Sequence, residues 1–226
     1  MSLLHFFIAF VAGLVPAMFW LREDKKHPEP YRLVAVSVIS GMAIIPLVLP
    51  LQQLAAELYV GANLMLVWVT IEESLKYLVA LVVVLWNKAV DEPIDLIMYM
   101  IFVAIGFAAL ENTLFIYNPI LQGAYEEIFI TGGTRFVGAT LLHILASATI
   151  GVFMAFAFYK SKAVKLLYGI LGLCIAIVLH TLFNFSIMNA QLNTVLYVFL
   201  VVWIGIVGLF IVFEKIKHLY HRTFNY

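Results

Sequence analysis

"VWVTIEESLKYLVALVVVLW" (residues 67–86) is an apolar run with Glu72, Glu73 and Lys76 near its middle. About 20 residues of helix cross the hydrocarbon core of a bilayer. A charged side chain at that depth costs about 2.5–3.5 kcal/mol on insertion scales, so such residues face the interior of a bundle and pair with one another. The run therefore predicts a membrane helix that contributes polar groups to a buried site.

The composition of the whole chain agrees with a membrane protein. The chain has 226 residues, of which 65% are hydrophobic and only 12% charged, and its mean hydropathy is +1.06. A soluble domain of this length needs far more charge to cover its surface. The formal net charge is zero, so nothing in the charge balance indicates a nucleic-acid partner. The first ten residues, "MSLLHFFIAF", lack a basic segment and a cleavage site, so we expect them to stay in the membrane.

Working outward from the central run, the sequence contains seven apolar runs of membrane-spanning length. The connections between them are short, and the longest are residues 22–32 and 118–134. We therefore expect one all-α domain over residues 1–226, a polytopic bundle of about seven transmembrane helices. The expected spans are residues 3–21, 33–51, 63–86, 95–117, 135–159, 165–188 and 193–213.

Lysine and arginine residues fall almost entirely on one side of this arrangement. Arg135 lies on the other side and Lys76 lies within a span. By the positive-inside rule, the N-terminus is outside and the C-terminus is cytoplasmic. The residues on the cytoplasmic side are Arg22, Lys25, Lys26, Arg32, Lys88, Lys160, Lys162, Lys165, Lys215, Lys217 and Arg222.

The polar residues of four spans reach a similar depth in the outer half of the membrane. At 1.5 Å per helical residue, the depths below the outer edge are about 14 Å for Glu72 and Glu73, about 8–9 Å for Glu111 and Asn112, about 12 Å for His143 and His180, and about 6 Å for Asn184. Polar groups from four helices at one level predict a single site. Within it, Lys76 can pair with Glu72 at i, i+4 or with Glu73 at i, i+3.

These residues resemble the PrsW family of intramembrane proteases. The resemblance rests on "EESLK" (72–76), "FAALEN" (107–112), His143 in the next span and "HTLFN" (180–184), in that order. The PrsW family is related to the CAAX prenyl endopeptidases and bacteriocin-processing enzymes. The resemblance implies a peptidase of the plasma membrane. Its substrate would be a membrane-anchored protein, which we expect to have a single span. The resemblance implies anti-sigma factors as the class of substrate and their first cleavage as the reaction.

The resemblance also implies roles for the residues of the site. Glu72 would activate water as the general base, with Glu73 paired or supporting it, and His180 and Asn184 would stabilise the oxyanion. Glu111 stands where the CAAX group typically has His, so we expect His143 to orient water or to protonate the leaving amine. Lys76, Glu111 and Asn112 would support these groups. Peptide hydrolysis requires an activated water, oxyanion donors and a proton for the departing nitrogen.

Two other interpretations use the same residues. A zinc site could be built from His143, His180, Glu72 and Glu111 with an open position for water, although no HExxH spacing guarantees its geometry. We prefer the mechanism without a metal. A proton-coupled transporter also carries ionisable residues in the membrane. It would need polar residues on a path to both faces, whereas the inner half of the third to sixth spans is nearly all apolar.

Overall fold

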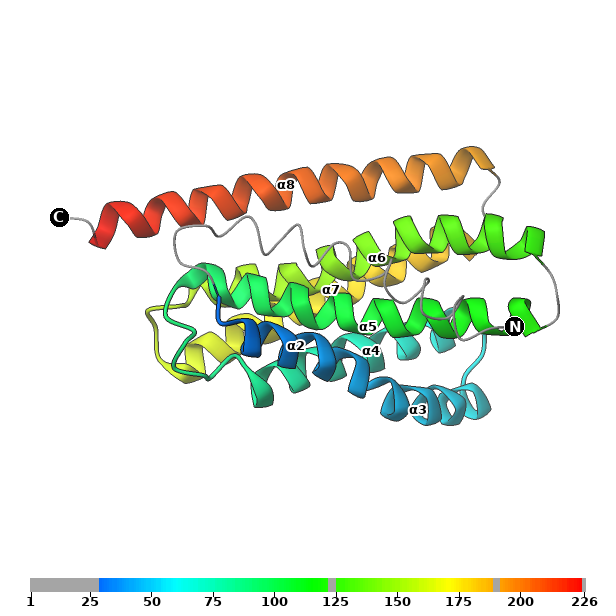
Figure 1. Cartoon of the computed structure of the whole chain (residues 1–226), viewed down its shortest axis with the longest axis horizontal. Helices are drawn as coiled ribbons and strands as arrows, with labels where there is room; N and C mark the ends of the chain where they lie inside the picture. The colour runs from blue at the N-terminus through cyan, green and yellow to red at the C-terminus, as the bar shows by residue number, and fades with distance from the viewer. Residues whose placement is uncertain (1–28, 122–124, 189–191, 225–226) are drawn as a thin grey trace.

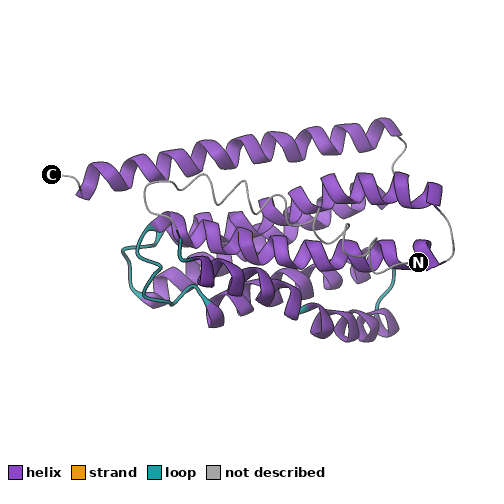
Figure 2. Ribbon diagram, viewed as in Figure 1, coloured by secondary structure: helices purple, strands orange, loops and turns teal. Residues whose placement is uncertain are grey.

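The computed structural model describes residues 29–121, 125–188 and 192–224, and every regular element in these ranges is an α-helix (Figure 1, Figure 2). The expected first span, 3–21, lies outside the described residues. In lipid, backbone N–H and C=O groups find no water, and an α-helix pairs them within the segment itself. The helices are α2 (Tyr31–Ala43), α3 (Ile45–Leu58), α4 (Gly61–Val83), α5 (Pro93–Leu121), α6 (Tyr125–Phe156), α7 (Lys162–Met188) and α8 (Leu192–Phe224).

Helix α5 is the centre of the bundle. It packs against α2 on one side and α6 on another, while α7 packs on α6 and on α4 (Figure 1). Its side chains from Leu96 to Ile105 are fully buried. A helix that is apolar all round is covered by neighbouring helices or by lipid. The burial of this segment therefore places it in the protein interior rather than against lipid.

Glycines allow α2 and α5 to approach closely. A Cβ atom on Gly41 would collide with the main-chain oxygen of Val103, and one on Gly106 would collide with that of Val38. Small residues at a helix crossing let the two backbones come into contact, which is how membrane helices gain packing energy. The crossing fixes α2 beside α5 and hence places α3, which follows α2, near α4.

The segment expected as one span at 33–51 forms two helices. Helix α2 ends at Ala43, a turn at Ile44 follows, and α3 carries Pro46 in its first turn and Pro50 in its interior. Proline has no amide hydrogen and its ring displaces the carbonyl four residues earlier, so it breaks or bends a helix. Because α3 continues to Leu58, the helical segment extends beyond the expected span.

Five helical segments in the described part of the chain are long and apolar enough to cross a membrane: 31–58, 93–115, 138–156, 162–187 and 196–217. Helix α4 has 23 residues, about 34 Å, but carries Glu72, Glu73 and Lys76. The protein is a multi-pass membrane protein. Most of the expected loop at 118–134 is helical, since α5 ends at Leu121 and α6 begins at Tyr125. Apolar runs mark the hydrocarbon core, whereas these helices continue beyond it.

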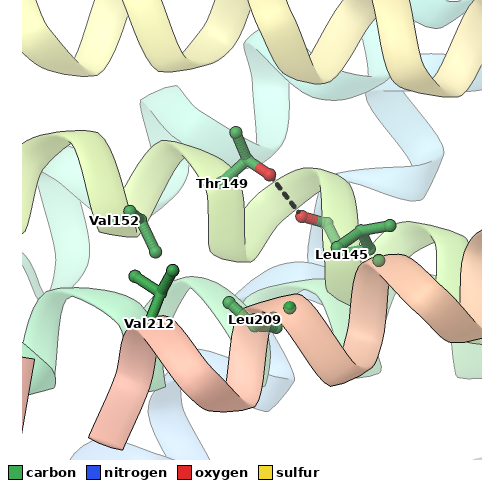
Figure 3. A pocket seen from close by; sticks show the side chains of 7 residues that line it. Leu145, Thr149, Val152, Leu209 and Val212 are labelled. Carbon is green, nitrogen blue, oxygen red and sulfur yellow. Dashed lines mark hydrogen bonds between the residues drawn. The ribbon is translucent and has the colours of Figure 1, made fainter. Parts of the chain in front are cut away.

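A cavity of about 180 Å³ lies between α6 and α8 (Figure 3). No titratable side chain lines it, and its hydroxyl, on Thr149, donates to the main-chain oxygen of Leu145 at 2.8 Å. This apolar space is therefore distinct from the polar cluster described below. Its lining residues are Leu145, Thr149, Val152, Gly205, Gly208, Leu209 and Val212.

Candidate active site

Helix α4 places three ionisable side chains in the interior of the bundle. Glu73 and Lys76 are fully buried, and Glu72 is 6% exposed. Of the two pairings that the helical spacing allows, the structure has the one at i, i+3: Lys76 Nζ donates to Glu73 Oε1 at 2.5 Å. A buried charge is tolerated only when it is paired and hydrogen-bonded. The two adjacent glutamates thus have different surroundings, because Glu73 holds the lysine and Glu72 does not.

His180 on α7 connects the two glutamates. Its Nδ1 lies 2.7 Å from Glu73 Oε1, and its Nε2 lies 3.8 Å from Glu72 Oε2. A carboxylate accepts hydrogen bonds, so the hydrogen of a neutral ring is on Nδ1 and the lone pair of Nε2 faces Glu72. Glu73 therefore sets both the tautomer and the direction of the imidazole.

His143 on α6 has the opposite tautomer. Its Nδ1 lies 3.0 Å from Lys76 Nζ, and an ammonium group can only donate. The ring hydrogen is then on Nε2, which donates to Glu111 Oε2 on α5 at 3.0 Å. The rings of His143 and His180 meet edge to face, with centroids 4.9 Å apart. Both nitrogens of His143 are engaged, whereas Nε2 of His180 faces the remaining glutamate.

Glu72 has a partner that sequence reasoning missed. Gln52 Nε2 on α3 donates to Glu72 Oε1 at 2.7 Å. The other oxygen of Glu72, Oε2, is buried and has no hydrogen-bond partner among the described residues. Gln52 gave little signal in the sequence because it lies just past the expected end of the span 33–51. The run "PLQQL" (50–54) places two amides in an otherwise apolar segment and could have marked it.

The two asparagines occupy different places. Asn112 is buried and its Nδ2 donates to Thr140 Oγ1 on α6 at 2.9 Å, so it joins α5 to α6 beside the cluster. Asn184 is half-buried, one turn beyond His180 on α7, and its side chain makes no hydrogen bond to another described residue. Its amide is available to a ligand. The structure thus brings Glu72, Glu73, Lys76, Glu111, His143 and His180 into one cluster, with Asn112 and Asn184 at its edges.

The cluster has the donors of a metal site. Glu72, Glu73, His143 and His180 each bring one ligand atom to within 4.8 Å of the others. Imidazole nitrogen and carboxylate oxygen bind zinc at about 2.0–2.2 Å. A histidine that binds a metal usually donates its other ring N–H to a carboxylate, as His180 does to Glu73. These residues therefore fit a zinc ion. Lys76 already supplies one positive charge in the same cluster, to Glu73 and to His143.

Carboxyl groups and imidazoles gathered inside apolar helices indicate a functional site within the membrane, since such groups are costly in lipid unless they serve function. The chain belongs to the family described as PrsW family intramembrane metalloprotease, whose sequence model matches residues 29–210. It is a membrane peptidase, and its substrates are proteins of the membrane. Family membership thus favours the peptidase interpretation over the transporter.

Individual relatives are similar to most of the chain. Protease PrsW of Clostridioides difficile (strain 630) is 25% identical over 194 residues, which cover 82% of this chain and 80% of the relative. Protease PrsW of Bacillus subtilis (strain 168) is 27% identical over 203 residues, covering 84% and 87%. Protease PrsW of Shouchella clausii (strain KSM-K16) is 26% identical over 196 residues, covering 83% and 86%. No solved structure matches the chain.

Proposed function

We propose that the protein is an intramembrane endopeptidase in which Glu72 activates water to hydrolyse a peptide bond of a membrane-anchored protein. One observation carries the proposal: Glu72 Oε2 is buried without a hydrogen-bond partner among the described residues and lies 3.8 Å from His180 Nε2. A buried carboxyl oxygen left unpaired costs free energy, and a water molecule there would satisfy it. Glu72 and His180 together offer two acceptors for the two hydrogens of that water.

The remaining polar groups support a complete hydrolysis. The water oxygen attacks the carbonyl carbon as one of its hydrogens passes to Glu72 Oε2. Asn184 donates to the oxyanion that forms. This assignment differs from the expected role of His180 as a second oxyanion donor, because the Nε2 atom that faces Glu72 carries no hydrogen in the tautomer set by Glu73. Glu72 then gives the proton to the peptide nitrogen, the C–N bond breaks, and a carboxylic acid and an amine leave. Glu73 holds His180 in the required tautomer, and Lys76 balances the charge of Glu73.

His143 acts as a positioning residue in this scheme. Its two nitrogens bond Lys76 and Glu111, at 3.0 Å each, so it connects α4 and α5 through α6. This assignment differs from a role in protonating the leaving amine, which would require one nitrogen to face the substrate. Because His143 orders Lys76, its removal disturbs Glu73 and, through it, His180.

The assignment of the base is tested by replacing each glutamate with glutamine. Glu72→Gln is expected to reduce cleavage by about 10²–10⁴-fold, the usual contribution of a general base, while the protein remains inserted and folded. The substrate is found by comparing the membrane proteomes of cells that carry the active enzyme or the Glu72→Gln variant. If Glu72→Gln cleaves normally and Glu73→Gln is inactive, the two roles are exchanged.

We further propose that the substrate is a single-span anti-sigma factor, cut at its first site on the extracytoplasmic side. The support for this class is the family resemblance of the four motifs. In the proteomic comparison, a single-span protein with a cytoplasmic sigma-binding domain should accumulate full-length in cells with Glu72→Gln. Accumulation of multi-pass proteins or soluble exported proteins alone would contradict the proposal.

Zinc-dependent hydrolysis is the second candidate mechanism, and the four donor atoms within 4.8 Å favour it. Glu72, His180 and His143 would hold the ion, and His143 would have to give up its present hydrogen bond with Lys76 or Glu111 to do so. The ion would lower the pKa of a bound water and polarise the substrate carbonyl. The purified enzyme is incubated with excess chelator, and its metal content, thermal unfolding and cleavage are measured. Cleavage without bound metal supports the glutamate mechanism. If the enzyme holds stoichiometric zinc, and if stability and cleavage return only when zinc is added back, the zinc mechanism is correct and the glutamate mechanism is wrong.

A further inference from the structure

The two oxygens of the Glu72 carboxyl group have different environments. Oε1 accepts a hydrogen bond from Gln52 Nε2 at 2.7 Å, and Oε2 is buried without a partner and faces His180. A carboxyl group rotates as a plane, so a directional bond to one oxygen fixes the position of the other. The terminal torsion of a glutamate is otherwise broad, with no strong preferred angle. Whatever holds Oε1 therefore determines where Oε2 points.

Gln52 is itself held from two directions on one face of α4. Its main-chain oxygen accepts a hydrogen bond from Trp68 Nε1 at 2.9 Å, and its side chain reaches Glu72. Trp68 and Glu72 are at i, i+4 and share a face of the helix. Gln52 thus bridges two consecutive turns of α4, with its backbone fixed by one and its amide directed at the other. The Trp68 bond fixes the position of the Gln52 backbone, from which the side chain reaches Glu72.

An amide is chemically suited to this task. It donates a hydrogen bond without carrying a charge, so it adds no second cation to a buried cluster that already contains Lys76. An amide is also not a base, so it does not compete with Glu72 for the proton of water. Gln53, the next residue, is exposed and has no hydrogen bond to another described side chain, which shows that the contact belongs to position 52 and to its direction on α3.

We propose that Gln52 is a positioning residue of the peptidase, which holds Oε1 of Glu72 so that Oε2 is presented to the reacting water. The inference rests on the proposed function, because it assumes that Glu72 is the base. It also assigns a function to α3: this helix, which follows the break at Ile44, completes the site from outside the four helices that carry the ionisable residues.

The test compares Gln52→Leu with Gln53→Leu, the same substitution one residue further along α3. Cleavage is measured in detergent on the single-span protein that the proteomic comparison identifies. Gln52→Leu is expected to lower kcat by about 10–100-fold, as loss of a hydrogen bond to a charged group does, with KM changed less than about twofold. Gln53→Leu is expected to keep the parent values. Trp68→Phe removes only the indole N–H and should lower kcat by a smaller factor.

An infrared measurement on ¹³C-glutamate-labelled protein separates this inference from the proposed function. The carboxyl band that Glu72→Gln removes should shift in Gln52→Leu and stay unchanged in Gln53→Leu. If Glu72→Gln remains active, the proposed base is wrong, and the band still reports the contact. If the band does not shift, or if kcat of Gln52→Leu and Trp68→Phe equals that of Gln53→Leu, Gln52 does not position Glu72. Thermal unfolding of each variant shows that the compared proteins are folded.

Discussion

Lys76 shows at the scale of a residue how the interior of this bundle holds charge. Its ammonium group is fully buried, donates to Glu73 at 2.5 Å, contacts His143 Nδ1 at 3.0 Å and lies 4.9 Å from the centre of the Phe107 ring. A buried ion pair contributes little net stability, but breaking it leaves one charge without compensation. Lys76 therefore stabilises the structure by compensating the charge of Glu73.

We predict that Lys76→Met destabilises the protein by about 3–5 kcal/mol, since Glu73 keeps its place in the interior without the cation. The methionine side chain has a similar length, so packing changes little. The free energy of unfolding is measured in detergent by denaturant titration. The matched control is the double variant Glu73→Gln/Lys76→Met, which removes both charges and should recover most of the loss. Equal destabilisation of the single and double variants would show that lost packing, not the unpaired charge, causes the effect.

The sequence predicted which residues carry charge into the membrane, but it left open how they are paired. Glu72, Glu73, His143 and His180 stand out because each is polar in an apolar run. The choice between i, i+3 and i, i+4 for Lys76 depends on side-chain rotamers that neighbouring helices select, and sequence spacing does not encode it. Gln52 lay beyond the expected end of its span, so its depth could not be compared with that of Glu72.

At the scale of the helices, the close crossing of α2 and α5 depends on two glycines. We predict that Gly106→Ala destabilises the protein and lowers cleavage, because the added Cβ atom meets the main-chain oxygen of Val38 and the backbones must separate. Since α2 leads into α3, such a shift also moves Gln52 away from Glu72. Unfolding free energy and kcat are measured together for this variant.

Gly208 on α8 is the matched control for this substitution. A Cβ atom there meets no heavy atom within 4 Å, and the residue borders the apolar cavity between α6 and α8. Gly208→Ala should therefore be neutral or slightly stabilising, because alanine favours a helix over glycine by about 1 kcal/mol. If both variants lose the same stability, the crossing of α2 and α5 is not the sensitive contact.

Helix boundaries were harder to predict than the helices themselves. Apolar runs correctly indicated helical segments within α5 to α8, yet the expected loop at 118–134 is mostly helical and the expected span at 33–51 is broken at Ile44. The length of an apolar run reflects the thickness of the hydrocarbon core. A helix instead ends where its backbone hydrogen bonds end, which can be outside that core. Pro46 and Pro50 favour a bend in this segment, but its place after Ala43 depends on the packing of α2 against α5.

At the scale of the whole molecule, two described connections that carry basic residues lie at one end of the bundle. The connections that follow α4 and α6, residues 84–92 and 157–161, lie at the same end as the C-terminal end of α8 (Figure 2). They carry Lys88 and Lys160, and the connection at Tyr59 and Val60 lies at the opposite end (Figure 1). A bundle with its positive charge at one end has a defined preference for one orientation.

We predict that this basic end faces the cytoplasm. The chain has a single cysteine, Cys174, so Val60→Cys and Lys88→Cys are each introduced into a Cys174→Ala background. Val60 is 83% exposed and Lys88 is also exposed, so both thiols will be accessible from their own side of the membrane. A membrane-impermeant maleimide added to intact cells should label position 60 and should label position 88 only after the cells are permeabilised. The reverse pattern would contradict the prediction, because it would place the basic end outside.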